Sequence, residues 1–154
     1  MNFEFSEEQL MLRDSVARFI QDNYSFDERQ AIARSQEGIS RDNWNTFAEL
    51  GWLSIPFAEE HGGFGGSAVD VMLVMEQLGK GLVLEPYMAT VLLFGGLLAK
   101  GAGAELQAEY IPRIIEGSCL GAFAYLERQS RYELADVLTS ATAVAGGYRL
   151  DGEK

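Results

Sequence analysis

The chain has 154 residues, and its 47% hydrophobic and 23% charged residues are typical of a soluble globular protein. Its formal net charge of -11 disfavours binding to nucleic acids and to anionic membrane surfaces, because their phosphates attract clusters of Lys and Arg. The single cysteine, Cys119, excludes an intrachain disulfide and favours a reducing compartment. The length allows one sizeable domain, or one domain and the beginning of another.

The first residues, MNFEFSEEQL, lack the basic start and the apolar core of a secretory signal peptide. The most apolar run, Met88 to Ala99, contains two adjacent glycines and is well short of the roughly 20 apolar residues that span a bilayer. We therefore expect a cytoplasmic protein.

Helical patterns occupy the first third of the chain. Ser6 opens the segment SEEQ, a capping box, and apolar residues at helical spacing extend the predicted helix to about Asp22. A more polar helix is predicted over residues 27–36. Ser40 predicts the start of a third helix, and Gly51 occupies the position of a left-handed C-terminal cap.

A Gly-rich segment, HGGFGG, separates these helices from the next ones. Ser67 predicts a new helix start, with Asp70 in the third helical position. Pro86 suits the first position of a further helix, which continues to about Lys100. Because this helix is apolar on nearly every side, we expect it to be buried all round at the centre of a bundle.

The sequence pattern changes from helical to strand-like near residue 117. A last helix is predicted over residues 104–116, where Pro112 should kink or restart it. The apolar run 119–126 is then typical of a buried strand, with Cys119 as a small hydrophobe. The alternating, β-branched run 137–144 and the short run 148–150 are typical of further strands.

The fold class expected from this order is mainly α: an N-terminal bundle of about six helices, followed by the first few strands of a β domain. We expect residues 1–117 to form the helical domain and residues 118–154 to begin the β domain. The pairs Gly146-Gly147 and Asp151-Gly152 predict tight turns around the last strand. Because two or three strands are only marginally stable without partners, we expect this part to be truncated.

Residue types alone reveal no catalytic site. The single histidine, His61, is interpreted as a solvated loop residue, and one His with one Cys makes a zinc site improbable. The segment GGFGG lacks the Lys and Ser or Thr of a phosphate-binding P-loop, and its glycines are interpreted as positions for unusual dihedral angles. The many carboxylates are typical of an acidic surface.

Several segments in the same order resemble the acyl-CoA dehydrogenase family, and the resemblance covers the entire chain. These segments are FSEEQLMLRDSVARFI, FAELGWLSIPFAEEHGGFGGSAVDVMLVMEQLGKG, LQAEYIPRIIEG, GAFAYLE and GYRLDGEK. The segment AYLERQSRYELADV is also similar to the small subunits of pimeloyl-CoA dehydrogenases.

The resemblance implies an N-terminal helical domain, a middle β domain and a C-terminal helical bundle, with FAD between the last two. In this family a glutamate removes the α proton of an acyl-CoA thioester while the β hydrogen leaves as hydride to the flavin. That glutamate is expected beyond residue 154, so the chain is expected to hold no catalytic residue and to be inactive alone. The resemblance also implies an oligomer with itself or another such subunit, and electron-transfer flavoprotein as acceptor.

The resemblance places the candidate cofactor residues in the first strand of the middle domain. Leu126 stands at the family's threonine, Glu127 at its glutamate and Tyr132 at its serine. Leu126 has no hydroxyl for the flavin ring, and Tyr132 is bulkier than the serine that reaches the phosphates. The backbone of the segment that contains Phe123, Tyr125 and Leu126 is still expected to contact the flavin edge.

Two arginines offer a substitute for the missing serine. Arg128 or Arg131 is a candidate partner for the FAD pyrophosphate, because Arg pairs with phosphate through two hydrogen bonds. The alternative interpretation is that both arginines belong to a solvated loop.

The acyl chain in this family runs between the N-terminal helices and the C-terminal bundle. Four residues of the helix that begins at Pro86 are therefore candidates for the wall of the substrate site: Tyr87, Thr90, Val91 and Phe94. Simple core packing explains the same residues equally well.

Two further interpretations remain open. The departures at Leu126 and Tyr132 fit a non-catalytic subunit that serves as the partner of a catalytic one. An independent helical module is also conceivable, but an exposed strand edge at its end would invite aggregation.

Overall fold

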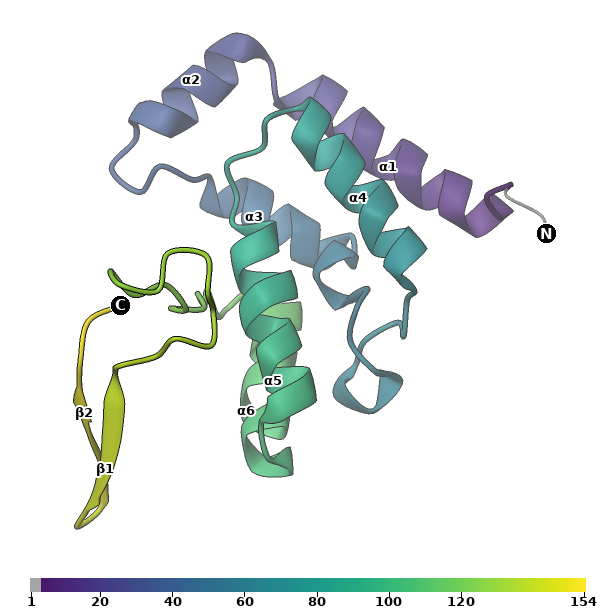
Figure 1. The fold of residues 1–154 in the computed structure, drawn as a ribbon. Helices are drawn as coiled ribbons and strands as arrows, with labels where there is room; N and C mark the ends of the chain where they lie inside the picture. Colours follow the sequence, from purple (N-terminus) through teal and green to yellow (C-terminus); the bar gives the residue numbers. More distant parts are fainter. Residues whose placement is uncertain (1–3) are drawn as a thin grey trace. The chain divides into compact units, whose positions relative to one another are not determined.

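The computed structural model describes residues 4–154, which divide into two compact units between Ala122 and Phe123. The first unit is helical, and the second contains the strands (Figure 1). The chain is thus mainly helical, with six α-helices followed by a two-stranded antiparallel sheet, as the sequence predicts.

The helices of the first unit are short to medium in length. In chain order they are α1 Glu7–Asn23, α2 Phe26–Arg34, α3 Arg41–Glu49, α4 Ala68–Lys80, α5 Gly95–Gly101 and α6 Ala104–Ile115. Two single turns of 3₁₀-helix, η1 Trp52–Ser54 and η2 Glu59–His61, lie between α3 and α4. A π-helical stretch, η3 Met88–Phe94, leads directly into α5.

Local capping explains most of the helix starts. The capping box predicted at Ser6 is present, and Ser67 caps α4 as predicted, in a capping box with Asp70. A third capping box, at Ser25, begins α2 one residue earlier than predicted. Gly51 has the left-handed conformation expected of it, with φ of 76°. These features depend only on neighbouring residues, which is why sequence patterns identify them.

Aromatic side chains from α1, α3 and η1 form the centre of the core. The rings of Phe19, Phe47 and Trp52 have their centroids 5.0 to 5.5 Å apart. Trp44 is fully buried, and its indole N–H donates to the carbonyl oxygen of Gly117 at 3.0 Å. α1 also packs along α4, so both helices cover this core.

The helix predicted to be buried on every side has an exposed side. Thr90, Val91 and Leu98 are buried, but Met88 and Leu97 are 55% and 44% exposed. Leu93 lies on the same exposed side. It follows Met88 by five residues, the spacing that stacks residues in a π-helix, and it precedes Leu97 by four, the corresponding spacing in an α-helix. The apolar composition was therefore a misleading guide to burial.

Pro112 does not restart the last helix. α6 runs as a single element from Ala104 to Ile115 with Pro112 inside it. Its inner side contributes Ile111 and Ile114, which are fully buried.

The glycines of HGGFGG act in the manner expected from the sequence. Gly62 and Gly65 have φ of 84° and 62°. Gly63 lies so close to the backbone of Phe57 that a Cβ there would be 2.0 Å from its carbonyl oxygen. The loop is a closely packed structural feature of the first unit.

The second unit contains one hairpin. β1 Ser140–Val144 pairs with β2 Gly147–Asp151, and Val144 lies opposite Gly147. The two-residue turn is therefore Ala145-Gly146, one residue earlier than predicted, and Gly146 has φ of 84°. The predicted strands 137–144 and 148–150 thus correspond to β1, from Ser140 onward, and to β2.

The buried strand predicted over residues 119–126 is wrong. These residues form no strand, and within the described chain no strand pairs with them. Phe123, Tyr125 and Leu126 are exposed, and Cys119 is only half-buried. An apolar run becomes a strand only when another strand supplies the hydrogen-bonding ladder, which no pattern within the run can reveal.

Among the described residues, none of the helices combines the length and the apolar character that crossing a membrane requires.

Candidate functional site

Tyr87, the first of the predicted wall residues, lies at the start of the π-helical stretch and is 2% exposed. Its hydroxyl donates to the carbonyl oxygen of Trp52 at 3.0 Å. Burial raises the pKa of Tyr87 above its ordinary value of 10.0, so the phenol stays protonated. Its remaining edge borders a surface hollow of about 360 Å³, which Met75 and Leu78 of α4 also line.

Thr90 is fully buried, and its hydroxyl serves both backbone groups of Gly121. It donates to the Gly121 carbonyl oxygen at 3.0 Å and lies 3.3 Å from the Gly121 amide nitrogen, which donates to it. A single side chain thereby replaces the two backbone partners that a neighbouring strand would provide. Thr90 thus fixes the chain just before the boundary between the two units.

Phe94 packs on the same glycine. A Cβ at Gly121 would lie 2.0 Å from the Phe94 ring, so only glycine fits there. Val91 is fully buried and borders a different hollow, of about 330 Å³. The structure therefore brings Thr90 and Phe94 together around Gly121, whereas Tyr87 and Val91 border separate hollows.

Phe123–Leu126, which we name the 123–126 run, contains three of the four predicted cofactor residues. Phe123, Tyr125 and Leu126 are 41%, 37% and 51% exposed, and the two aromatic rings lie 5.5 Å apart. Among the hydrogen bonds of the described residues, none involves the backbone of this run. Four consecutive residues thus offer their N–H and C=O groups to a partner or to water.

Tyr132, the fourth predicted cofactor residue, lies in the loop that follows the run and is 99% exposed. The neighbouring Arg131 has φ of 45°, an uncommon backbone conformation for a residue with a side chain. Arg128 forms an exposed ion pair with Glu153 at 2.6 Å. Of the two arginines considered for a phosphate group, Arg131 is the one without an ion-pair partner in the described part of the chain.

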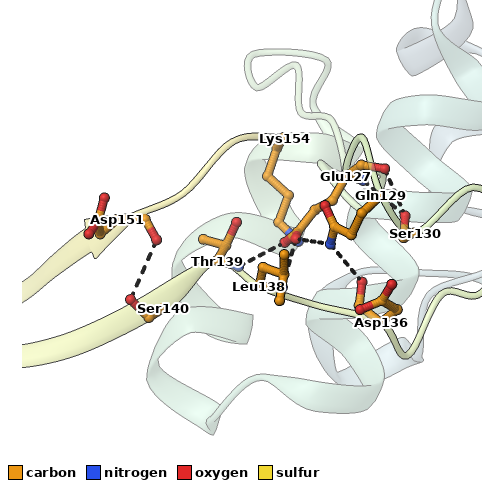
Figure 2. A network of polar contacts seen from close by, with 9 residues as sticks. All are labelled: Glu127, Gln129, Ser130, Asp136, Leu138, Thr139, Ser140, Asp151 and Lys154. Atoms are coloured by element: carbon orange, nitrogen blue, oxygen red, sulfur yellow. Dashed lines mark hydrogen bonds and ion pairs between the residues drawn. The ribbon is translucent and has the colours of Figure 1, made fainter.

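Glu127 follows the run directly and is the centre of a polar network (Figure 2). Its side chain is 3% exposed. Oε1 lies 2.8 Å from Lys154 Nζ and accepts the backbone N–H of Thr139 at 3.1 Å. Oε2 accepts the backbone N–H of Leu138 and the Gln129 side-chain amide, both at 2.7 Å.

The electrostatic consequence is a firmly ionised carboxylate. The Lys154 ammonium, followed by the hydrogen bonds from Gln129 and Leu138, holds the pKa of Glu127 far below its ordinary value of 4.5. Sequence reasoning noted Glu127 as the retained family glutamate but assigned it no role. Its retention beside the departure at Leu126 was the available signal.

The two residues considered for catalysis or metal binding lie elsewhere. His61 belongs to η2 and is 16% exposed, with Nε2 at 3.3 Å from Gln107 Oε1, so its interpretation as a solvated residue is wrong. Cys119 is half-buried and packs against the helical core. In residues 4–154, no group of three or more His, Cys, Asp and Glu is arranged to hold a metal ion.

Comparison with known proteins identifies the helical unit. The family model described as acyl-CoA dehydrogenase, N-terminal domain, matches residues 6–118. Over 97% of its length the chain is 31% identical to the mitochondrial isovaleryl-CoA dehydrogenase of Pongo abelii, of which it covers 36%. Over its whole length it is 29% identical to the probable acyl-CoA dehydrogenase YngJ of Bacillus subtilis, of which it covers 40%.

Solved structures agree with this fold. The FAD complex of PigA matches 99% of the chain with a TM-score of 0.83 and 27% identity, over 40% of that protein. The ChsE4-ChsE5 complex from Mycobacterium tuberculosis matches 99% of the chain with a TM-score of 0.85, and at 24% identity it shows the fold alone.

The chain spans about 40% of the length of these relatives. The family model matches well over half of the chain, from the first helix to the end of α6. The chain therefore belongs to the acyl-CoA dehydrogenase family and carries its N-terminal domain.

Proposed function

We propose that this chain is the N-terminal part of an FAD-dependent acyl-CoA dehydrogenase subunit, which introduces an α,β double bond into an acyl-CoA thioester. The observation that carries the proposal is the family match over residues 6–118, followed by a small β unit. In this proposal residues 1–117 are the helical domain, and residues 118–154 are the start of the middle β domain. A pimeloyl-CoA-like thioester is the substrate suggested by the segment AYLERQSRYELADV.

The 123–126 run supports the assignment of FAD as cofactor. Its backbone N–H groups have no partner within the described chain, and its side chains Phe123, Tyr125 and Leu126 are exposed. This donor set fits the polar edge of a flavin ring, although Leu126 supplies no hydroxyl. Arg131, beside Tyr132, is the candidate for the pyrophosphate. When bound, the flavin accepts the hydride that leaves the β carbon.

The substrate proposal concerns the helix from Tyr87 to Phe94. Thr90 and Tyr87 direct their hydroxyls to backbone carbonyl groups. These residues, with Val91 and Phe94, would therefore shape the wall by packing rather than by hydrogen bonding to the thioester.

The isolated chain is expected to be colourless and inactive on acyl-CoAs, because the family's catalytic glutamate matches no position in it. Absorbance spectra of the purified protein and an electron-acceptor assay with pimeloyl-CoA test this expectation. A preparation with near-stoichiometric flavin absorbance, or with turnover, would contradict it. Sequencing the gene beyond the codon for Lys154 would show whether the remaining domains are encoded.

A second candidate function is that of a non-catalytic partner subunit in a heteromeric acyl-CoA dehydrogenase. The replacement of the family threonine by Leu126 and of the family serine by Tyr132 favours it, and a relative of the same fold is described as the ChsE4-ChsE5 complex. Purification of the native protein separates the two candidates. A flavin-loaded second subunit that co-purifies supports the partner role, whereas a self-sufficient homo-oligomer excludes it.

The proposal includes a cytoplasmic location and electron-transfer flavoprotein as the electron acceptor. It includes no nucleic-acid or membrane partner, in keeping with the net charge of -11.

A further inference from the structure

Glu127 joins three separate parts of the second unit. Its carboxylate is bonded to the backbone at Leu138 and Thr139, eleven and twelve residues later, and to Lys154 at the end of the chain. Hydrogen bonds between its two ends thereby close the segment between Glu127 and Leu138 into a loop. Figure 2 shows these contacts converging on one carboxylate.

A second set of bonds holds the beginning of the same loop. The Ser130 hydroxyl donates to the Glu127 carbonyl oxygen at 2.9 Å, and the Glu127 amide nitrogen donates to that hydroxyl at 3.2 Å. Ser130 is 4% exposed, so this contact is also shielded from water. Both the backbone and the side chain of Glu127 are therefore fixed, although no helix or strand contains it.

The 123–126 run ends at this fixed residue. One residue, Ala122, separates its other end from Gly121, which Thr90 holds through both backbone groups. The run itself makes no backbone hydrogen bond within the described chain, so the nearest residue of the second unit that hydrogen bonds hold in place is Glu127.

We propose that Glu127 is a positioning residue: it holds the 123–126 run in an exposed arrangement in which its backbone groups meet the flavin edge. This inference rests on the proposed function only for the identity of the ligand. Glu127 does not touch the flavin in this proposal. It acts through the run that precedes it and through the loop closed at Leu138 and Thr139.

The test uses the isotopically labelled 154-residue protein and the variants Glu127→Gln and Glu153→Gln. Glutamine keeps the size of the side chain but removes the charge that strengthens four contacts. Glu153 is the matched control, because it is a carboxylate of an exposed ion pair beside the same network. NMR spectroscopy reads amide hydrogen exchange, backbone order parameters and the shifts caused by millimolar FAD.

In Glu127→Gln, amide exchange at Leu138 and Thr139 should accelerate by at least about tenfold, as expected for lost charge-assisted hydrogen bonds. Order parameters in the 123–126 run should fall from about 0.85 to below about 0.6. FAD should shift the amides of this run in the wild-type protein and in Glu153→Gln, and the response should weaken at least about tenfold in Glu127→Gln.

Two internal controls keep the result interpretable. The amides of the β1–β2 pair Thr142–Arg149 report whether the hairpin survives the substitution. If the hairpin is lost in Glu127→Gln, the variant Lys154→Met is measured instead. Lys154→Met removes the ammonium but keeps the Glu127 carboxylate and its hydrogen bonds to the backbone. It should produce a smaller change in the same direction.

If the order parameters of the 123–126 run are the same in the wild-type protein and in Glu127→Gln or Lys154→Met, the inference is overturned, regardless of the response to FAD. Loss of order in the variant, combined with no FAD response in the wild-type protein, would support the positioning role and count against the flavin assignment. The two proposals can thus fail separately.

Discussion

The contacts of Glu127 make the second unit sensitive to acid. The carboxylate is bonded to one ammonium, one side-chain amide and two backbone N–H groups, and the ammonium of Lys154 contributes most to lowering its pKa. A carboxylate with a lowered pKa binds protons less readily in the folded chain than in the unfolded one. Its stabilising effect is therefore complete above the unfolded value and declines as pH falls through the folded value.

We predict that the amide protection of Leu138 and Thr139 is constant from neutral pH down to about pH 4.5 and decreases below it. Glu127→Gln should lack this dependence, because the amide side chain does not titrate in this range. Amide hydrogen exchange across a pH series measures this protection in the wild-type protein and in Glu127→Gln. Equal pH profiles in the two proteins would show that Glu127 is not responsible for the loss of protection.

Thr90 provides a second test at the scale of one residue. Thr90→Val keeps the shape of the side chain but leaves the N–H and C=O of Gly121 without their partner, which should lower the free energy of unfolding by about 1–3 kcal/mol. Thr90→Ser keeps the hydroxyl and should recover most of the loss. Urea denaturation followed by tryptophan fluorescence compares the three proteins, and identical midpoints would refute the role assigned to the hydroxyl.

At the scale of elements, a buried hydrogen-bond chain joins the end of α1 to the segments before α3 and before the π-helical stretch. The Tyr24 hydroxyl donates to Glu85, which also accepts the backbone N–H of Ser40 at 3.0 Å. The same hydroxyl accepts the backbone N–H of Leu84 at 3.2 Å. Burial, followed by the hydrogen bond to Glu85, raises the pKa of Tyr24, so the phenol stays a donor.

Tyr24→Phe should therefore destabilise the helical unit by about 1–3 kcal/mol, because the buried Glu85 carboxylate loses one of its two donors and the backbone N–H of Leu84 loses its acceptor. Tyr132→Phe is the matched control, since Tyr132 is 99% exposed and its hydroxyl should contribute almost nothing. Thermal unfolding followed by circular dichroism gives the comparison. A Tyr24→Phe midpoint equal to that of the control would show that water satisfies the exposed groups.

The elements that could be predicted from sequence are those encoded by neighbouring residues. Ser6, Ser67 and Gly51 mark helix ends through contacts within one turn, and they were identified correctly. The run 119–126 was misread because strand formation requires a distant partner. The role of Glu127 was missed for the same reason, since its charged partner, Lys154, lies 27 residues further along the chain.

At the scale of the whole molecule, the buried apolar side chains belong to the helical unit. Every buried hydrophobic residue of the described chain lies between Val16 and Ile114. In the second unit the buried residues are polar, Glu127 and Ser130, and both strands are exposed throughout. Apolar burial is the main stabilising contribution to a domain, so the helical unit should account for most of the stability of the chain.

A protein consisting of residues 1–122 should therefore fold cooperatively, with a melting temperature within about 4 °C of the full chain, which corresponds to a difference of about 1 kcal/mol. The truncation retains Gly121 and its partner Thr90, together with every residue of the hydrophobic core cluster. Circular dichroism melting curves of both proteins test the expectation. A much lower midpoint for residues 1–122 would mean that residues 123–154 stabilise the helices, and the second unit would then have to be regarded as part of the domain rather than as the start of another.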